Sequence, residues 1–569
     1  MVLDSSCEVQ APAAADRGNG RARTLLDMES QPLLPMQHLT VPDFHYGALG
    51  RGGKGLDFVE GGATFEHAVT ETGFGRFHYG LMALCGLVYL DTAMGITILS
   101  FVLPAAQCDF DMDSPKKGWL TAAPMLGMVL GSYFWGCLAD TRGRRVVLIA
   151  TLVMDGICGV ASSVSQFYGV FMFLRFLNGF AITGAMGIVF PYLGEFQPTK
   201  YRENILCWME LFWTCGIILL PGIAWLVIPL PLRYESESFV FGSWQLFVAV
   251  CALPSLVVAA WLALYPESPK FLLECGEYED ALDVLQEMFH RNTGRPKSEY
   301  PVKSLREPRS RAMSVVSTTS RVSVKSLKPI RTPRDIKLLV EEVWDQTKQL
   351  CRPPHRYYTV LTCLIQFGLT TSYYTLMMWF PELFDRFEYF SKEHPGAEAS
   401  VCDVSGDALS PPSTVCPNQI DDSVFLHTLI VGLACIPTSF WLPLCVHRLG
   451  AKFFLVFSLV VSGVVAVGLY FVTNSTQNLI LSCVFEALTS LGISTVYCVM
   501  VDLFPTNLRV MAAALSLTFG RGGALFGNLI FSYLIDINCV LPIALFAAML
   551  FVSGVLCILL PNTGKVELD

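Results

Sequence analysis

Charged side chains lie inside several long apolar stretches of this sequence, where they are expensive to bury and usually serve a function. They are Asp91, Asp155, Arg175, Glu210, Glu486 and Arg521. In a dry cavity a carboxylate holds its proton tightly, whereas a neighbouring arginine favours the charged form. A motion that alternates these two surroundings would load a proton in one state and release it in the other.

Aromatic residues accompany these charges. Together with Glu210, Glu486 and Arg521, the candidates for a substrate cavity are Trp213, Tyr373, Tyr374 and Trp379. Their rings offer stacking or cation–π contacts to a ligand, although lipid contact or helix packing would use the same residue types. Amide side chains, which suit sugar hydroxyls, are scarce here. An organic cation or amine therefore fits this set better than a hexose.

The composition indicates which elements hold these residues. Hydrophobic residues make up 53% of the 569 residues and charged residues only 15%, and the mean hydropathy is +0.49. The apolar residues form continuous runs of about 20, the length of a membrane-spanning helix. Barrel strands would alternate instead. We therefore expect an all-α protein embedded in the lipid bilayer.

Twelve spanning helices are predicted in two groups of six. They cover 79–104, 118–138, 146–164, 167–192, 205–228 and 244–265, then 357–381, 424–446, 451–472, 477–501, 509–533 and 538–560. The expected domains are an N-terminal tail (1–76), a first bundle (77–265), a polar central loop (266–356), a second bundle (357–560) and a short C-terminal tail (561–569).

Basic residues between the second and third spans give the orientation. Arg142, Arg144 and Arg145 place that loop in the cytosol by the positive-inside rule, and with it both tails and the central loop. The loop 383–423 then lies on the opposite, luminal side. Cys402 and Cys416 in it either form a disulfide, as an oxidising compartment allows, or remain free thiols. Asn474 begins a glycosylation sequon there, close to two helices, so we expect poor occupancy.

The same basic loop carries a motif. It runs from Gly136 through Asp140, Arg142, Gly143 and Arg144 to Arg145, and it resembles the signature loop of the major facilitator superfamily. Gly143 permits the tight turn, and Asp140 can pair with a basic group. The matching place in the second half, from His447 to Lys452, keeps Arg448 but lacks the acid.

A second repeat supports duplication. Glu195, Pro198-Thr199 and Arg202 share their spacing with Asp502, Pro505-Thr506 and Arg509, and both resemble an element of the sugar-porter branch of that superfamily. Pro266-Glu267-Ser268-Pro269-Lys270 is similar to a further element of that branch. The resemblance implies that these charges form a cytoplasmic gate, an ion-pair network at the helix ends that stabilises the outward-facing state.

The resemblance also suggests a coupling pair. Tyr89-Leu90-Asp91-Thr92 is similar to the first helix of proton-coupled sugar porters, in which the acid works against an arginine of the fourth helix. Asp91 with Arg175 is the pair so implied. Asp155 is an alternative partner for Arg175, and a static ion pair that fixes helix register is an alternative role.

A narrower resemblance extends over residues 57 to 560. Ala63 to Phe77, Met209 to Trp213 and Ser372 to Pro381 resemble the synaptic vesicle glycoprotein 2 family and the synaptic vesicle two-related proteins. This similarity implies a vesicle membrane, with the plasma membrane as the alternative. Glu29 with Leu33 and Leu34 matches an acidic dileucine signal for sorting adaptors. Two departures are a short luminal loop and Gly95, where the two-related proteins carry a second acid.

Two functions follow from the sequence. The first is a secondary active transporter of a small organic solute, coupled to protons and working by alternating access. The second is a transporter-fold membrane protein that regulates vesicle trafficking, or serves as a receptor, without transport. An enzyme is not expected, because no nucleophile–base set, metal cluster or nucleotide-binding loop occurs. Neither a cofactor nor nucleic acid is therefore an expected partner.

Overall fold

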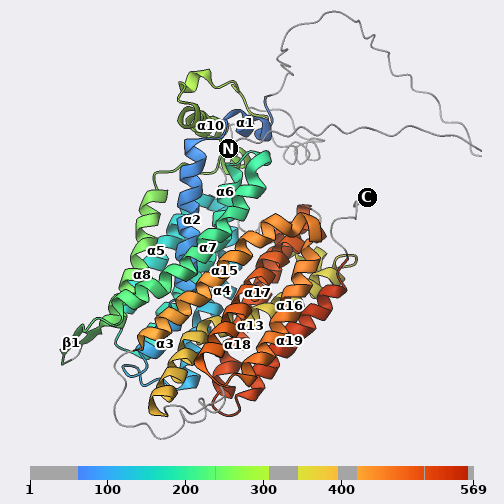
Figure 1. Ribbon diagram of the computed structural model, residues 1–569. Helices are drawn as coiled ribbons and strands as arrows, with labels where there is room; N and C mark the ends of the chain where they lie inside the picture. Colours follow the sequence, from blue (N-terminus) through green and yellow to red (C-terminus); the bar gives the residue numbers. More distant parts are fainter. Residues whose placement is uncertain are drawn as a thin grey trace, which may run out of the picture. The chain divides into compact units, whose positions relative to one another are not determined.

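The computed structural model describes residues 62–237, 239–306, 344–345, 347–394, 420–504 and 506–561. All of them belong to one compact unit, Val59–Asp569. Two sets of long helices form this unit, shown blue to green and yellow to red in Figure 1. We name them the N-terminal bundle (α2 to α8) and the C-terminal bundle (α13 to α19).

The N-terminal bundle and its attachments have the following elements: α1 (Phe65–Glu71), α2 (Arg76–Thr97), α3 (Leu99–Ala105), α4 (Ser114–Arg142), α5 (Arg144–Ser163), α6 (Tyr168–Glu195), α7 (Thr199–Val227), β1 (Arg233–Ser236), β2 (Phe239–Gly242), α8 (Ser243–Leu262), α9 (Pro269–Cys275), α10 (Tyr278–Thr293) and η1 (Lys297–Glu299). The C-terminal bundle has α13 (Arg356–Glu393), α15 (Asp422–Leu449), α16 (Ala451–Gly468), η2 (Leu469–Phe471), α17 (Ser475–Leu503), α18 (Thr506–Leu534) and α19 (Val540–Ile558).

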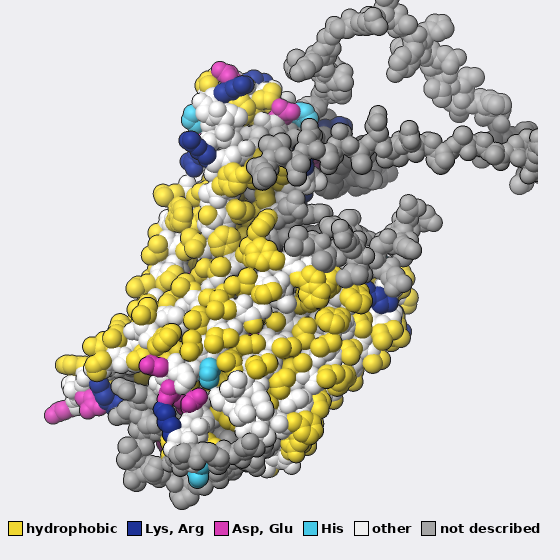
Figure 2. All heavy atoms as spheres, viewed as in Figure 1, with side chains coloured by type: hydrophobic (Ala, Val, Ile, Leu, Met, Phe, Trp, Pro, Cys, Tyr) yellow, Lys and Arg dark blue, Asp and Glu magenta, His cyan; other side chains and the backbone are white. Residues whose placement is uncertain are grey.

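Ten of the described spans are long and apolar enough to cross a membrane, with α2 and α3 counted as one span of 30 residues. The other two predicted spans correspond to α13 and α18, which have the length but carry more Tyr, Thr and Gly. Large apolar side chains face outward, as Leu226 does with 77% exposure. Figure 2 shows the resulting apolar belt, with charges gathered at its two ends. This is the surface that a lipid bilayer covers.

The two ends differ in their elements. We call the end with the α4–α5 turn the basic-loop end, and the end with the β1–β2 hairpin the hairpin end. At the basic-loop end α1, α9 and α10 form a small cap, in which the backbones of Ala63 and Leu305 pair as a parallel bridge. Tyr300 anchors this cap, because its hydroxyl donates to the Ala68 carbonyl at 2.6 Å.

Close packing holds each bundle together. In the N-terminal bundle α4 and α6 approach so closely that a Cβ added at Gly127 would lie 2.8 Å from the Phe180 nitrogen. Small residues at such a crossing are the usual device of membrane helices. The bundles meet where α4 contacts α18, α7 contacts α15 and α3 contacts α13. Phe101 of α3 and Phe425 of α15 stack across this interface with centroids 5.8 Å apart.

The structure also changes some predicted boundaries. α13 continues to Glu393, beyond the predicted end at 381, so the first part of the predicted loop 383–423 is helical. The sequence analysis did not predict the β1–β2 hairpin, in which Arg233 to Ser236 pair antiparallel with Gly242 to Phe239, nor the helices α9 and α10 within the central loop.

Candidate functional site

Three charged residues meet inside the N-terminal bundle. Asp155 of α5 accepts hydrogen bonds from the Asn178 amide of α6 and, at 2.7 Å, from the Ser255 hydroxyl of α8. Arg175 of α6 interacts electrostatically with Asp155, while its guanidinium donates to the Ser162 hydroxyl. The structure therefore brings Asp155 and Arg175 together, as the sequence suggested. Each of them also makes hydrogen bonds to neutral polar side chains.

Asp91 of α2 completes this coupling cluster. Its side chain is 3% exposed, and its Oδ2 atom has no hydrogen-bond partner among the described residues. Asp91, Asp155 and Arg175 line one small pocket of about 10 Å³, room for about one water molecule. Gly95 lines the same pocket, one turn along α2. Asp91 thus has one unsatisfied carboxylate oxygen and lines a pocket with room for about one water molecule.

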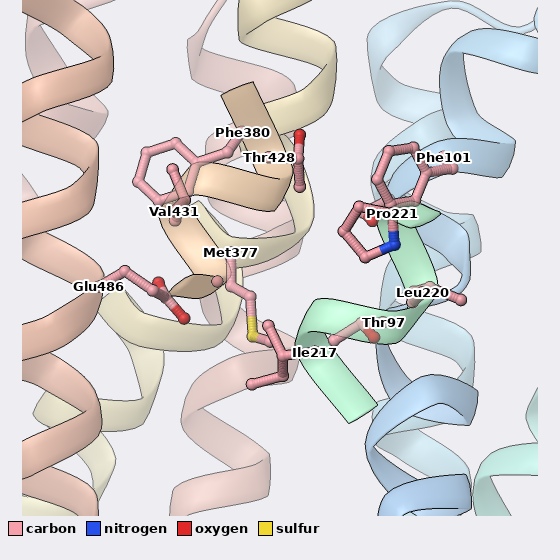
Figure 3. Close-up of a pocket in the computed structure, with 12 residues that line it drawn as sticks. Thr97, Phe101, Ile217, Leu220, Pro221, Met377, Phe380, Thr428, Val431 and Glu486 are labelled. Atoms are coloured by element: carbon pink, nitrogen blue, oxygen red, sulfur yellow. The ribbon is translucent and has the colours of Figure 1, made fainter. Parts of the chain in front are cut away.

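A second pocket lies between the bundles, with a volume of about 30 Å³. Its lining combines α2, α3, α7, α13, α15 and α17, and it is mostly apolar (Figure 3). The lining residues are Thr97, Ser100, Phe101, Ile217, Leu220, Pro221, Met377, Phe380, Thr428, Val431, Gly432 and Glu486. Glu486 is the charged member of this lining, and Figure 3 shows it reaching from α17 toward Met377.

Three of the four predicted cavity aromatics lie at the interface between the bundles, and two of them, Tyr373 and Tyr374, interact with Glu486 of this pocket. Tyr373 and Tyr374 of α13 make an edge contact at 4.9 Å, and Tyr373 interacts across the bundle interface with Trp213 of α7. Glu210 and Arg521 both interact electrostatically with Tyr374. The structure thus groups these residues around the bundle interface.

Trp379 lies elsewhere. Its indole is fully buried, donates to the Asn528 side chain at 3.3 Å and packs on Phe531 at 4.9 Å. Both partners belong to α18, so Trp379 is a packing residue of the C-terminal bundle and does not line either pocket. Arg521 points to the N-terminal bundle, where it donates to Ser132.

The predicted gate residues form a network at the basic-loop end. Arg144 pairs with Asp140 at 3.1 Å and with Glu195 at 3.4 Å. The Glu267 carboxylate accepts from the Arg145 backbone nitrogen at 2.9 Å. Gly143 makes this approach possible with a φ of +102°. These contacts join the signature loop to α6 and to the segment that precedes α9.

Other predicted gate residues are arranged differently. Arg202 pairs with Glu66 of α1 at 3.0 Å and does not join the Arg144 network, and Arg142 is exposed. The side chains of Arg448, Asp502 and Arg509 lie outside the described part of the chain, as do Cys402, Cys416, Leu33 and Leu34. Asn474 is exposed and caps α17, since its side chain accepts from the Gln477 nitrogen at 3.0 Å.

The hairpin end contains a charged cluster that the sequence analysis missed. Lys117 of α4 donates to Glu382 of α13 at 2.5 Å, and Arg386 pairs with Glu382 at 3.1 Å and with Asp536 at 3.5 Å. Arg386 also reaches Ser114 of α4 at 3.2 Å. We call Lys117, Glu382 and Arg386 the latch, because they join the two bundles. Each lies near a predicted helix end, where a charge is ordinarily solvated, so its burial gave no signal.

Two cysteines at the hairpin end were also unanticipated. Cys108, which precedes α4, and Cys539, which caps α19, are each disulfide-bonded. Their presence at this end agrees with an oxidising environment there. Among the described residues, no group of three or more His, Cys, Asp or Glu side chains is placed to hold a metal ion.

Two apolar helical bundles with a pocket between them and a buried acid–base cluster define a multi-pass membrane protein of transporter type. Sequence comparison agrees, because the profile of the Major Facilitator Superfamily matches residues 85–392, more than half of the chain. The chain belongs to the Major Facilitator Superfamily.

Individual relatives share about a third or less of their aligned residues with this chain. Synaptic vesicle glycoprotein 2B of Mus musculus is 27% identical over 594 residues, covering 88% of this chain and 86% of that protein. Synaptic vesicle glycoprotein 2A of Rattus norvegicus is 31% identical over 351 residues, covering 59% of this chain and 46% of that protein.

Solved structures share the fold at lower identity. A partially occluded, inward-open xylose transporter, XylE of E. coli, has a TM-score of 0.61 and 15% identity, covering 86% of this chain and 99% of that one. A D-xylose–proton symporter has a TM-score of 0.59 and 14% identity, covering 87% and 100%. These likenesses confirm the predicted fold.

Proposed function

We propose that this protein is a secondary active transporter that moves a small organic solute in exchange for, or together with, protons. The observation that carries the proposal is the coupling cluster, in which Asp91, Asp155 and Arg175 surround a single water-sized pocket. Charges are costly at this depth in a membrane protein and are retained where they move ions or protons.

Asp91 is the proton carrier in this proposal. Its Oδ2 atom has no hydrogen-bond partner among the described residues, whereas Asp155 accepts from Asn178 and Ser255. We assign the role of positioning Arg175 to Asp155, which these two donors hold in place, and the proton exchange to Asp91. Movement of α2 against α5 and α6 would change the distance from Asp91 to Arg175 and so its proton affinity.

Alternating access supplies that movement. The latch closes the pocket between the bundles at the hairpin end, and the bundles would rock around this pocket, as pseudo-symmetric halves allow. We assign the basic-loop end to the cytosol because of Arg142, Arg144 and Arg145. Because the relatives are named synaptic vesicle glycoproteins, we place the protein in a vesicle membrane, with the hairpin end toward the lumen.

Those same names favour a second candidate, a transporter-fold protein that regulates vesicle trafficking without transport. In that case the coupling cluster would be a static element that sets helix register. The two candidates differ in the effect of Asp91→Asn, which keeps the size of the side chain but cannot release a proton.

The test uses the full chain reconstituted in liposomes with an imposed pH gradient and a metabolite mixture, followed by identification of what accumulates. Wild type should accumulate a solute, and Asp91→Asn should lose that accumulation while still exchanging the solute across the membrane without a gradient. Glu235→Gln, which removes an exposed carboxylate from β1, is the matched control. Equal accumulation in wild type and Asp91→Asn would remove Asp91 from the mechanism, and no accumulation by folded wild type would favour the regulator.

A further inference from the structure

We infer that the pocket between the bundles binds an organic monocation, a quaternary ammonium or protonated amine, with Glu486 as its counter-charge. The inference rests on the proposed transport function and names the chemical class of its substrate. It depends on the lining of this pocket and is independent of the coupling cluster, which lies within the N-terminal bundle.

The first argument is the state of Glu486. Its side chain is 1% exposed, and neither carboxylate oxygen makes a hydrogen bond of ordinary geometry with a described residue. The polar groups that interact with it include the hydroxyls of Tyr373 and Tyr374, none of which carries a positive charge. A buried carboxylate without a cation is costly. A ligand cation that entered the pocket would supply the missing partner.

The second argument is the direction of the hydroxyl groups. Thr97 donates to the Ala93 carbonyl of its own helix at 2.7 Å, and Thr428 donates to the Val424 carbonyl at 2.8 Å. With their hydrogens so engaged, both hydroxyls offer the pocket only acceptor lone pairs. The lining contains no Asn, Gln, Lys or Arg among the described residues. Among the described lining residues the Ser100 hydroxyl is the one left to donate, so a sugar or a carboxylate ligand would find few donors here, whereas an ammonium group needs acceptors.

The third argument is the apolar remainder of the lining. Phe101 and Phe380 offer aromatic rings, and Met377 offers a polarisable thioether. Aromatic rings attract the positively polarised alkyl groups of quaternary and protonated amines, and Met adapts to irregular ligand shapes. Since the pocket measures only about 30 Å³, it must widen as the bundles move, and a small ligand is favoured.

Arg521 does not neutralise this site. Its guanidinium donates to Ser132 of α4 and contacts the Met186 sulfur of α6 at 3.8 Å. Arg521 is absent from the lining of the pocket, so the charge that faces a ligand is negative.

The test measures equilibrium binding to the purified full chain in lipid nanodiscs. The probes are choline, the larger phenyltrimethylammonium, and 3,3-dimethylbutan-1-ol, which has the shape of choline without its charge. At least one cation should bind, about tenfold or more tighter than the neutral alcohol, because the cation gains both the carboxylate and the aromatic rings. Glu486→Gln should lose about tenfold in cation affinity, Glu486→Asp should retain part of it, and Glu235→Gln should bind as wild type.

Failure of either cation to bind wild type, equal binding of the neutral alcohol, or unchanged cation affinity in Glu486→Gln would each overturn the assignment. The wild-type comparison of choline with its neutral isostere stands even where Glu486→Gln does not fold. Asp91→Asn separates this inference from the proposed function, because it should bind the cation normally while losing proton-driven accumulation. Proton-driven transport of a neutral solute, with no cation binding, would contradict only the cation assignment.

Discussion

The buried carboxylates of this protein differ in what satisfies them. Asp155 accepts two hydrogen bonds, from Asn178 and Ser255, and Glu382 is paired with Lys117 and Arg386. The buried acids therefore differ in how firmly their neighbours hold them. Glu382 Oε2 and Asp91 Oδ2 both lack a hydrogen-bond partner among the described residues, but Glu382 is paired with two cations, whereas Asp91 is in no ion pair recorded for the described residues. We therefore expect Asp91 to be the acid that exchanges a proton.

Asn178→Ala tests whether hydrogen bonds hold Asp155 in place. Removing the amide donor leaves one oxygen of Asp155 buried and unsatisfied, which should cost about 1–3 kcal/mol of stability. Thermal unfolding in nanodiscs measures the loss. In the Asp155→Asn background the same change should cost clearly less, because the two residues share one interaction. Additive losses would show that the Asn178–Asp155 contact contributes little.

Charged residues in the middle of apolar runs could be picked out from the sequence, whereas their neutral partners and the charged latch at the helix ends could not. Asp91, Asp155, Arg175 and Glu486 interrupt apolar runs, and that contrast marks them. Asn178 gives no such signal, since uncharged polar residues are common in spanning helices. The presence of an aromatic residue in a helix does not show which way its side chain points. Trp379 was therefore assigned to the substrate cavity, whereas in the structure it is buried against α18.

At the scale of elements, two corresponding turns have unequal surroundings. Gly143 before α5 and Gly450 before α16 have φ values of +102° and +81°, so both turns need a residue that tolerates the left-handed region. A Cβ at Gly143 would lie 2.9 Å from the Glu267 carboxyl carbon, whereas one at Gly450 would meet nothing within 4 Å. The first turn is thus fitted into the gate network, and the second is not crowded by any described neighbour.

Gly143→Ala and Gly450→Ala form a matched pair. Both should lose about 1–3 kcal/mol, because alanine is strained at the positive φ and extended ψ of these two positions. Gly143→Ala should lose more, because it also displaces Glu267 from the Arg145 backbone. Comparing the thermal midpoints of the two variants measures the difference, and equal midpoints would argue against a Glu267 contact in the folded protein.

An ion pair at the hairpin end allows a prediction about acidity. The Lys392 ammonium group, with help from Ser423, lowers the pKa of Asp421 from 3.8 to about 2. When folding lowers the pKa of a carboxyl group, that group stabilises the folded protein at any pH above its pKa in the unfolded chain. This stabilisation is lost only as the pH falls through the pKa of the folded protein. The pair should therefore persist in an acidic vesicle lumen.

Lys392→Ala should accordingly reduce the thermal midpoint by the same small amount at pH about 5.5 and about 7.5, both well above the titration of Asp421. The decrement should disappear only near pH 2, where the carboxyl group is protonated in wild type too. A decrement that is present at pH about 7.5 and absent at about 5.5 would show that Asp421 titrates in the physiological range instead.

Element positions were predictable to the extent that hydropathy decides them. Each predicted span corresponds to an observed helix, since lipid forces the backbone of a long apolar run to bond internally. Beyond the apolar runs this constraint ends. The C-terminal part of α13 and the β1–β2 hairpin depend on local packing. α10 does have a helical period, since its buried residues Ala281, Leu285, Met288 and Phe289 lie on one face, and the sequence analysis overlooked it.

At the scale of the whole molecule, the latch joins the bundles at the hairpin end while the Arg144 network lies within one bundle. Lys117 and Glu382 have side-chain exposures of only 2% and 5%. Removal of one member of a buried ion pair leaves an uncompensated charge and costs about 3–5 kcal/mol. The latch therefore favours closure at that end.

Glu382→Gln should shift the protein toward a state open at the hairpin end. Ser100→Cys places a thiol in the lining of the pocket between the bundles. The rate at which a membrane-impermeant maleimide, applied from the hairpin side, labels this thiol measures opening at that end. Labelling should be faster in the combined variant than with Ser100→Cys alone, and Glu382→Gln without the added cysteine corrects for native thiols. Equal rates would mean that the latch does not control access.

The bridge between Ala63 and Leu305 has a mechanical consequence. It ties the start of the central segment to the N-terminal bundle through the cap, while Leu350 packs with Phe504 and Leu508 of the C-terminal bundle. The two ends of the central segment are thus held by different bundles. Any movement of one bundle against the other therefore also moves these two anchors relative to each other, and the cap travels with the N-terminal bundle.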